Sequence, residues 1–463
     1  MLKMDKILNH FKIRKFKDNI LLVTEQGNWV VLTKKEYDDF ICGDVNSNKK
    51  LDDLGLLIDK TNFEKIVAKQ KSLYSQLFCG TSLHIVVPTL RCNLKCDYCH
   101  SRAKSESVSG YDMDEETARK TVDFIFQTPS KQVKIEFQGG EPLLNFDIVK
   151  YVIGYAEELN KDKKKDLKFA LVTNLIKMDD DKLKYLIEHN VGLCTSLDGP
   201  KNVHDILRRR YSGAGSYDSV VSWIKTIHGQ YKYPLAALMV TTKWSLDYPE
   251  GIIDEYLKLG FDRIQIKFLS NLGNAQKVWG DISYSAEEYL TFWRAAIDYM
   301  VELNMGGGGI HESITTYILK KILTDEPNVF VDLQSPCGAV INQLAYDCKG
   351  DIYTCDEGRQ YDLFKLGNVG GGKFNQVCTS DEASAIIAAS VNDCFLCDAC
   401  VYKPYCGLCP VCCYAESGTL VPKLAMNDRC KILKGMFDYI FEKLIFSEDH
   451  KRVFNEWAKQ GNK

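Results

Sequence analysis

The stretch CNLKCDYC, residues 92–99, places three cysteines close together, directly after the apolar run LHIVVP at residues 83–88. The run predicts a buried strand, so the cysteines are expected in the loop at its carboxyl end. Four cysteines would close a tetrahedral metal site, whereas three thiolates on a cubane 4Fe-4S cluster leave one iron open. An open iron can bind and reduce a small molecule. On spacing alone, the alternative is a zinc site completed by His100 or by a distant residue.

Composition limits the class of protein. The chain has 463 residues, 45% hydrophobic and 26% charged, which at roughly 150 residues per domain suggests about three domains. A net charge of −3 gives no electrostatic footprint for nucleic acid, and no apolar run approaches the roughly 20 residues that span a bilayer. The first residues contain no apolar signal-peptide region, so a cytoplasmic location is expected. In a reducing cytosol, 18 cysteines indicate metal binding or catalysis rather than disulfides.

Six short apolar runs alternate with amphipathic stretches from residue 83 onward. The runs have few polar residues, as strands covered on both faces do, and the stretches 114–127 and 146–159 have a helical period. Six βα repeats predict an α/β fold with a parallel sheet and right-handed crossovers, either open or closed into a partial (β/α)6 barrel. Functional side chains are expected at the carboxyl ends of the strands. The predicted strands are 83–88, 133–138, 168–173, 192–197, 236–241 and 263–268.

Smaller units are predicted on either side of the repeats. Residues 19–31 indicate a hairpin around Gln26-Gly27, and Thr33 is placed to cap a helix that follows. These signals predict a small N-terminal α+β module. The predicted organisation is this module at 1–76, the repeats at 80–300, a linker at 301–334, a cysteine-rich domain at 335–432 and a C-terminal helix at 433–463.

Polar residues follow the second, third and fourth predicted strands. GGEP at 139–142 exposes backbone at its glycines and offers the Glu141 carboxylate to an ammonium group, and Asn174 follows the next strand. SLDG at 196–199 and HDILRRR at 204–210 come after the fourth strand, and an arginine there could pair with a carboxylate. Each motif alone is typical of a turn. Their order on consecutive strands indicates one ligand with sugar and amino-acid parts.

The pattern Cys92-x3-Cys96-x2-Cys99, with GGEP after the second strand, resembles the radical S-adenosylmethionine (SAM) enzymes over about residues 80–290. The resemblance implies that a 4Fe-4S cluster reduces SAM to methionine and a 5′-deoxyadenosyl radical, which abstracts a hydrogen atom. The cofactor supplies this reactivity, and the protein supplies placement. By position, the resemblance implies cluster ligands Cys92, Cys96 and Cys99, an adenine contact at Tyr98, methionine amino-group contacts at Gly139, Gly140 and Glu141, ribose-side residues Asn174, Ser196 and Asp198, and a methionine carboxylate contact at Arg208.

A second field of cysteines lies between Cys337 and Cys430. Its density predicts metal, and the alternative to iron is one or two structural zinc ions. The spacing resembles the SPASM extension of peptide-modifying radical SAM enzymes, which carries two auxiliary 4Fe-4S clusters. The resemblance implies that Cys337, Cys355 and Cys409 serve the first cluster, and that Cys397, Cys400, Cys406 and Cys430 serve the second.

The cysteine field departs from the SPASM pattern at one point. Two residues separate Cys406 from Cys409 where the pattern has three, so Cys412 or Cys413 could take the place of Cys409. The fourth ligand of the first cluster is left open between Cys348, Cys412 and a free site for a substrate thiolate. Cys378 and Cys394 stay unassigned. Asp356 matches an aspartate that acts as a catalytic base in sulfatase-maturing relatives, and its alternative role is to cap a turn.

Three longer stretches are similar to peptide maturases of the His-Xaa-Ser and CXXX-repeat target groups. They are DLQSPCGA (332–339), YTCDEGR (353–359) and YKPYCGLCPVCCYAESG (402–418). The resemblance implies a ribosomally made precursor peptide as substrate and, as the first expectation, a thioether crosslink from a cysteine sulfur to carbon. The alternatives are oxidation of Cys or Ser to formylglycine, a carbon–carbon crosslink, and a non-catalytic metal-bound scaffold that binds peptide.

The resemblance also implies partners. The N-terminal module would be winged-helix-like and bind the leader part of the peptide as an added strand, or else be a decoration without a ligand. A flavodoxin or ferredoxin is the expected electron donor. Neither nucleic acid nor membrane is expected as a partner.

Overall fold

The computed structural model of the chain describes residues 7–42, 51, 54–326, 330–423 and 427–460. Parts of the predicted N-terminal module, linker, cysteine-rich domain and C-terminal segment lie outside the described residues; they are 1–6, 43–50, 52–53, 327–329, 424–426 and 461–463.

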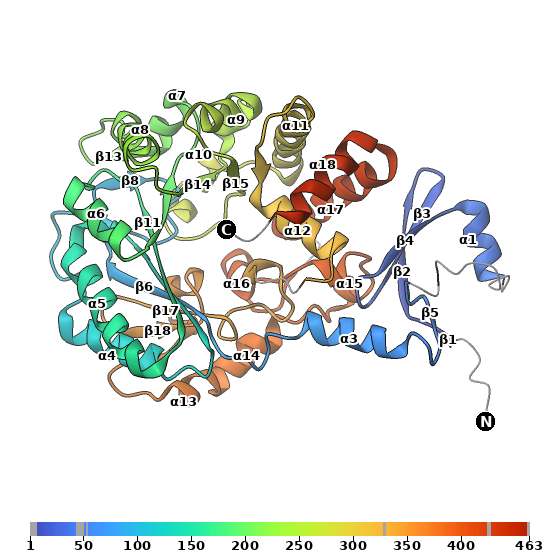
Figure 1. Cartoon of the computed structure of the whole chain (residues 1–463), viewed down its shortest axis with the longest axis horizontal. Coiled ribbons are helices and arrows are strands. Elements are labelled where there is room, and N and C mark those ends of the chain that lie inside the picture. The colour runs from blue at the N-terminus through green and yellow to red at the C-terminus, as the bar shows by residue number, and fades with distance from the viewer. Residues whose placement is uncertain (1–6, 43–50, 52–53, 327–329, 424–426, 461–463) are drawn as a thin grey trace.

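A single ten-stranded sheet forms the centre of the described structure, in the order β16-β15-β14-β12-β11-β10-β6-β17-β18-β19 (Figure 1). All six strands predicted from the apolar runs are present and lie side by side in chain order. Each pairs in parallel with its neighbours, which confirms the predicted βα repeats. These strands are β6 (Leu83–Thr89), β10 (Gln132–Gly139), β11 (Asp166–Thr173), β12 (Gly192–Ser196), β14 (Leu235–Val240) and β15 (Arg263–Lys267).

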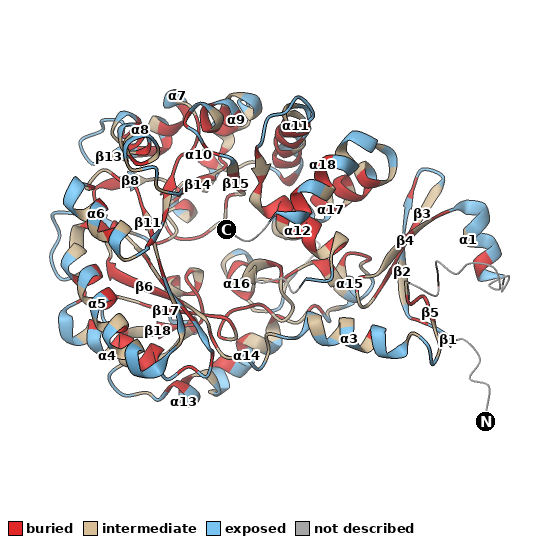
Figure 2. Ribbon diagram, in the orientation of Figure 1, coloured by how far each residue is buried: buried red, intermediate tan, exposed pale blue. Residues whose placement is uncertain are grey.

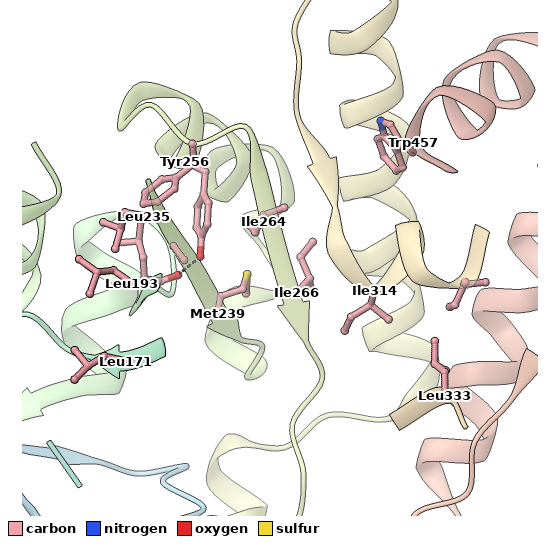
Figure 3. Packing of buried hydrophobic residues seen from close by; sticks show 14 of the residues in the cluster. Leu171, Leu193, Leu235, Met239, Tyr256, Ile264, Ile266, Ile314, Leu333 and Trp457 are labelled. Atoms are coloured by element: carbon pink, nitrogen blue, oxygen red, sulfur yellow. Dashed lines mark hydrogen bonds between the residues drawn. The ribbon is translucent and has the colours of Figure 1, made fainter. Parts of the chain in front are cut away.

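Helices cover the outer face of the curved sheet, and their apolar sides face it (Figure 2). Both predicted helices are found, as α4 (Glu115–Ile125) and α5 (Phe146–Lys163). Asp114 caps α4 by accepting a hydrogen bond from the amide of Thr117. The core continues along the sheet through Leu171, Leu193, Met239 and Ile266 (Figure 3). The remaining covering helices are α6 (Asp180–Glu188), α8 (Tyr217–Thr226), α9 (Pro249–Lys258) and α11 (Ala286–Met305).

The cysteine-rich part of the chain extends the same sheet. Its first strand, β17 (Gln343–Tyr346), pairs in parallel with β6, the first strand of the repeats. Strands β18 (Asp351–Tyr353) and β19 (Lys365–Asn368) follow antiparallel. At the other end, β16 (His311–Glu312) pairs with β15 and leads into α12 (Ser313–Leu323). The sheet therefore holds the second cysteine field against the three-cysteine loop.

The described part of the N-terminal module contains a three-stranded antiparallel sheet, a helix beside it, and a short strand pair of β1 (Ile7–Leu8) and β5 (Leu57–Ile58). Strands β3 (Asn19–Thr24) and β4 (Trp29–Thr33) form the predicted hairpin, and Thr33 forms a capping box with Glu36 at the start of α1 (Lys34–Ile41). A third strand, β2 (Phe11–Phe16), was not anticipated. The module docks through the Trp29 indole, which donates to the carbonyl of Ile322 over 2.9 Å. Helix α3 (Phe63–Leu73) leads from the module to β6.

The C-terminal segment contains two helices rather than the single helix predicted. Helix α17 (Asp428–Phe446) ends at Ser447, whose side chain then caps α18 (Glu448–Lys459) by accepting from the amide of His450. Both pack on α11, and α18 also packs on α12 (Figure 1). Across the residues described, every helix is too short or too polar to cross a membrane.

Candidate active site

The three-cysteine loop lies at the carboxyl end of β6, as predicted. Cys92 is buried, and Cys96 and Cys99 are half-buried. The loop is held by short strands, because β8 (Leu94–Cys96) pairs with β13 (Arg208–Arg210), with Cys96 opposite Arg208. Burial raises the pKa of the Cys92 thiol well above its usual range, and that of Cys96 to about 12. Three gathered thiols fit a cubane cluster with one open iron, whose positive charge would hold them as thiolates.

Glu141 ties the ends of two neighbouring strands together. Its carboxylate accepts hydrogen bonds from the Thr173 hydroxyl at 2.6 Å and from the Asn174 amide at 2.8 Å. The side chain of Asn174 in turn donates to Asn93 over 2.8 Å, inside the three-cysteine loop. Glu141 is only 1% exposed, and burial raises its pKa. The predicted SAM-contact residues Glu141 and Asn174 thus lie beside the cluster loop.

Gly139 and Gly140 allow β10 to approach the residues before Cys92. Gly139 has φ +121°, and a Cβ on Gly140 would lie 2.1 Å from the carbonyl oxygen of Arg91. The amide of Gly140 donates to Thr89 over 2.9 Å, and that of Glu141 donates to Arg91 over 2.7 Å. A side chain at residue 140 would therefore displace the cluster loop. This steric requirement explains the glycine independently of the predicted contact with methionine.

Asp198 and Arg208 form a buried ion pair beside Cys96. The Arg208 Nε donates to Asp198 Oδ2 over 2.7 Å, and the Tyr98 hydroxyl donates to the same oxygen. Asp198 is fully buried and Arg208 is 7% exposed. The structure thus brings together three predicted SAM contacts, with Asp198 engaged by the chain's own donors. Ser196 lies buried at the end of β12 nearby.

Tyr211 belongs to the same site but was not predicted from the sequence. Burial raises the pKa of its hydroxyl, and the nearby thiols of the three loop cysteines raise it further. Its only signal in the sequence is its position directly after the arginines of β13.

The cysteines of the second field fall into two groups. Cys337, Cys355, Cys409 and Cys412 interact with one another, and the Cys412 amide lies 3.5 Å from the Cys409 sulfur. A second set of mutual interactions joins the other predicted ligands, Cys397, Cys400, Cys406 and Cys430. In the described residues, no three His, Cys, Asp or Glu side chains are close enough for a single metal ion. A 4Fe-4S cluster has several iron atoms and takes thiolates that lie farther apart.

The grouping bears on the cysteines that the sequence left open. Cys412 lies with the first group, and Cys413 is also close to Cys409. Cys348 packs in the main hydrophobic core, whereas Cys337, Cys355 and Cys412 pack together in a separate cluster, which argues against Cys348 as the fourth ligand. Cys394 contacts Cys397 in the second group, a proximity that the sequence reasoning missed.

Asp356, the predicted base, is already engaged by the imidazole of His100 and the guanidinium of Arg359. His100 Nε2 lies 2.7 Å from one carboxylate oxygen, and Arg359 donates to the other from Nε at 3.0 Å. Burial alone would raise the pKa of Asp356, but Arg359 and His100 hold it well below its usual range. A carboxylate with so low a pKa is a weak proton acceptor, so this arrangement favours a positioning role.

A cavity lies between the loop that follows β15 and the second cysteine field. Its volume is about 190 Å³, and Phe268, Asn271, Cys412 and Arg429 are among its lining residues. The loop after β15 separates the cavity from the cluster loop, because the amide of Asn274 donates to the carbonyl of Cys99 over 2.9 Å. The cavity thus borders the first auxiliary group directly through Cys412, and the cluster loop only through the loop after β15.

The Radical SAM superfamily model matches residues 86–240, which carry the three-cysteine loop and the strand-end residues. Residues 86–240 are a radical SAM domain. The protein is a radical SAM enzyme, and SAM and 4Fe-4S clusters are its cofactors.

The sequence similarity of this radical SAM enzyme to curated relatives extends beyond that domain. A cysteine-type anaerobic sulfatase-maturating enzyme of Clostridium perfringens is 26% identical over 375 residues, which cover 79% of this chain and 97% of the relative. A serine-type anaerobic sulfatase-maturating enzyme of Bacteroides thetaiotaomicron is 23% identical over 300 residues, 60% of this chain and 69% of the relative.

Two solved structures share the fold of this radical SAM enzyme. Native anSMEcpe with bound AdoMet has a TM-score of 0.69 at 21% identity and covers 81% of this chain and 99% of its own. Streptococcus suis SuiB bound to precursor peptide SuiA has a TM-score of 0.56 at 14% identity and covers 90% and 98%.

Proposed function

We propose that this radical SAM enzyme modifies a ribosomally made precursor peptide and joins a cysteine sulfur to a carbon atom in a thioether. The observation that carries the proposal is the cavity between the Cys409–Cys412 segment and the loop after β15, which itself contacts the cluster loop. A peptide side chain there would lie near the SAM site on one side and near the auxiliary group on the other. When bound, the cofactors supply the radical, and the chain's own residues hold the peptide and exclude water.

The N-terminal module supports a peptide substrate with a leader. The SuiB comparison spans 90% of this chain, whereas the anSMEcpe comparison spans 81%. In the three-stranded sheet of the module, β2 is an edge strand whose middle residues are exposed. We propose that the leader adds to this edge as a further strand. A flavodoxin or ferredoxin remains our proposed electron donor.

Formylglycine formation is the second candidate. The names of the curated relatives favour it, since several are anaerobic sulfatase-maturating enzymes. The contacts of Asp356 count against formylglycine formation if this aspartate must accept a proton. Burial raises the pKa of Asp356, but Arg359 and His100 lower it by more, and a carboxylate with a low pKa is a weak base.

Mass spectrometry separates the two candidates. The enzyme is produced without oxygen together with any small cysteine-containing peptide encoded beside its gene, and Cys96→Ala serves as the inactive control. A loss of two hydrogens per crosslink, with loss of a free thiol, supports the thioether. A new aldehyde in place of a cysteine or serine side chain supports formylglycine. Unchanged peptides, alongside SAM cleavage to 5′-deoxyadenosine, would contradict peptide modification.

A further inference from the structure

Arg429 lies between the two cysteine groups of the C-terminal field. It directly precedes Cys430 in the first turn of α17, and its guanidinium acts on Cys409 and Cys412 from the first group and on Cys406 from the second. It lines the 190 Å³ cavity with Cys412, and a smaller cavity of about 40 Å³ with Cys409 and Cys412. The residue is thus common to both groups.

The guanidinium is held by a main-chain carbonyl and an aromatic ring, and the Asp332 carboxylate also acts on it electrostatically. Its Nη2 donates to the main-chain carbonyl of Asp332 over 3.1 Å, and its centre lies 5.4 Å from the centroid of the Phe268 ring. The Nε is buried and has no hydrogen-bond partner among the residues described. In the described part of the chain no carboxylate lies within ion-pair distance of Arg429, although Asp332 and Glu357 line the smaller cavity with it. An arginine keeps its charge throughout the ordinary pH range, so a permanent cation faces both groups.

A fixed cation changes the energy of a nearby cluster. Four thiolates give a 4Fe-4S cluster a net negative charge, and reduction adds one more negative charge. A nearby positive charge stabilises the reduced form more than the oxidised form, and the effect is large where water is excluded. The reduction potential of such a cluster therefore rises.

We propose that Arg429 is a shared electrostatic partner of the two auxiliary clusters and raises the reduction potentials of both. The inference rests on the two cysteine groups holding clusters and not on which peptide is modified. It explains why an arginine, rather than an apolar residue, occupies a confined position between the groups.

The test is a potentiometric titration followed by electron paramagnetic resonance. It uses the full chain carrying Cys92→Ala, Cys96→Ala and Cys99→Ala, so that only the auxiliary clusters give signals. Arg429→Gln should lower both midpoint potentials, with at least a tenfold change in the reduced-to-oxidised ratio at fixed potential, about 59 mV for a one-electron couple. Arg429→Lys should keep both near the parent value. Arg452→Gln, at an exposed arginine on α18, is the matched control and should change neither.

Every outcome decides the inference. Unchanged midpoints in a fully loaded Arg429→Gln protein, or a shift in one cluster only, would overturn it. If Arg429→Gln loses iron, the Arg429→Lys variant is measured instead. Midpoint potentials like those of the parent in Arg429→Lys support the role of the charge. Loss of iron in Arg429→Lys as well would mean that Arg429 serves folding alone. Absence of auxiliary iron in the parent also overturns the inference, while peptide modification is still decided by mass spectrometry.

Discussion

His100 and Asp356 are 256 residues apart in the chain, yet the His100 Nε2 lies 2.7 Å from a carboxylate oxygen of Asp356. One residue directly follows Cys99 of the catalytic loop, and the other directly follows Cys355 of the first auxiliary group. The contact therefore fixes the spacing of the two cysteine sites. Arg359 reinforces it by donating to Ser101 over 3.3 Å as well as to Asp356.

Replacing His100 should destabilise this junction. The variant His100→Ala leaves one oxygen of Asp356 without its partner, and the Asp356 side chain is only 9% exposed. A buried acceptor without a partner costs about 1–3 kcal/mol. The free energy of unfolding, measured by denaturant titration without oxygen, should fall by that amount. His10→Ala, at an exposed ion pair with Glu25, is the control and should change it by less than about 0.5 kcal/mol. Equal stabilities for the two variants would contradict this role.

Removing Arg208 should affect both stability and SAM binding. Arg208→Gln leaves the buried Asp198 carboxylate without its cation, which costs about 3–5 kcal/mol. SAM affinity, measured by equilibrium dialysis, should fall as well if Arg208 binds the methionine carboxylate. Arg209→Gln is the matched control, since the neighbouring Arg209 is half exposed and pairs with Asp97 at the surface. Wild-type SAM affinity in a folded Arg208→Gln protein would remove Arg208 from the predicted contacts.

Iron content should distinguish Cys412 from Cys348. Cys412 lies within the first cysteine group, so Cys412→Ala should lower the iron bound after anaerobic reconstitution or alter the spectrum of one cluster. Cys348 lies outside both groups, and Cys348→Ala should leave the iron content unchanged. Full iron and unchanged spectra in Cys412→Ala would mean that the first cluster has an open site or another ligand.

A methyl group at Gly140 should disrupt the cluster loop. The Cβ would lie 2.1 Å from the Arg91 carbonyl, so Gly140→Ala forces the loop to move at a cost of about 1–3 kcal/mol. We expect lower iron in the catalytic cluster and less 5′-deoxyadenosine. Gly154→Ala is the control, because nothing lies within 4 Å of its Cβ in α5; it should be neutral or stabilise by about 0.5–1 kcal/mol. A fully active Gly140→Ala enzyme would show that the loop yields easily.

The sequence by itself determined the repeats and the main site. Apolar runs such as 133–138 and 168–173 specify strands because their burial needs no distant information. Three cysteines and the strand-end residues Glu141 and Asn174 could be brought together because parallel strands place their carboxyl ends at one edge. The role of Thr33 as a helix cap could also be predicted from the sequence, because a cap is a contact between near neighbours in the chain.

Only the tertiary structure decided how distant segments meet. The pairing of β17 with β6, the contact of His100 with Asp356 and the position of Arg429 all join residues far apart in the sequence. The same holds for the two cysteine groups, where spacing left Cys348 and Cys412 equivalent and folding separated them. Local propensity and periodicity report on neighbours in the chain. The pKa of a buried carboxyl group such as Asp356 depends on which charged side chains the fold brings within a few ångströms of it.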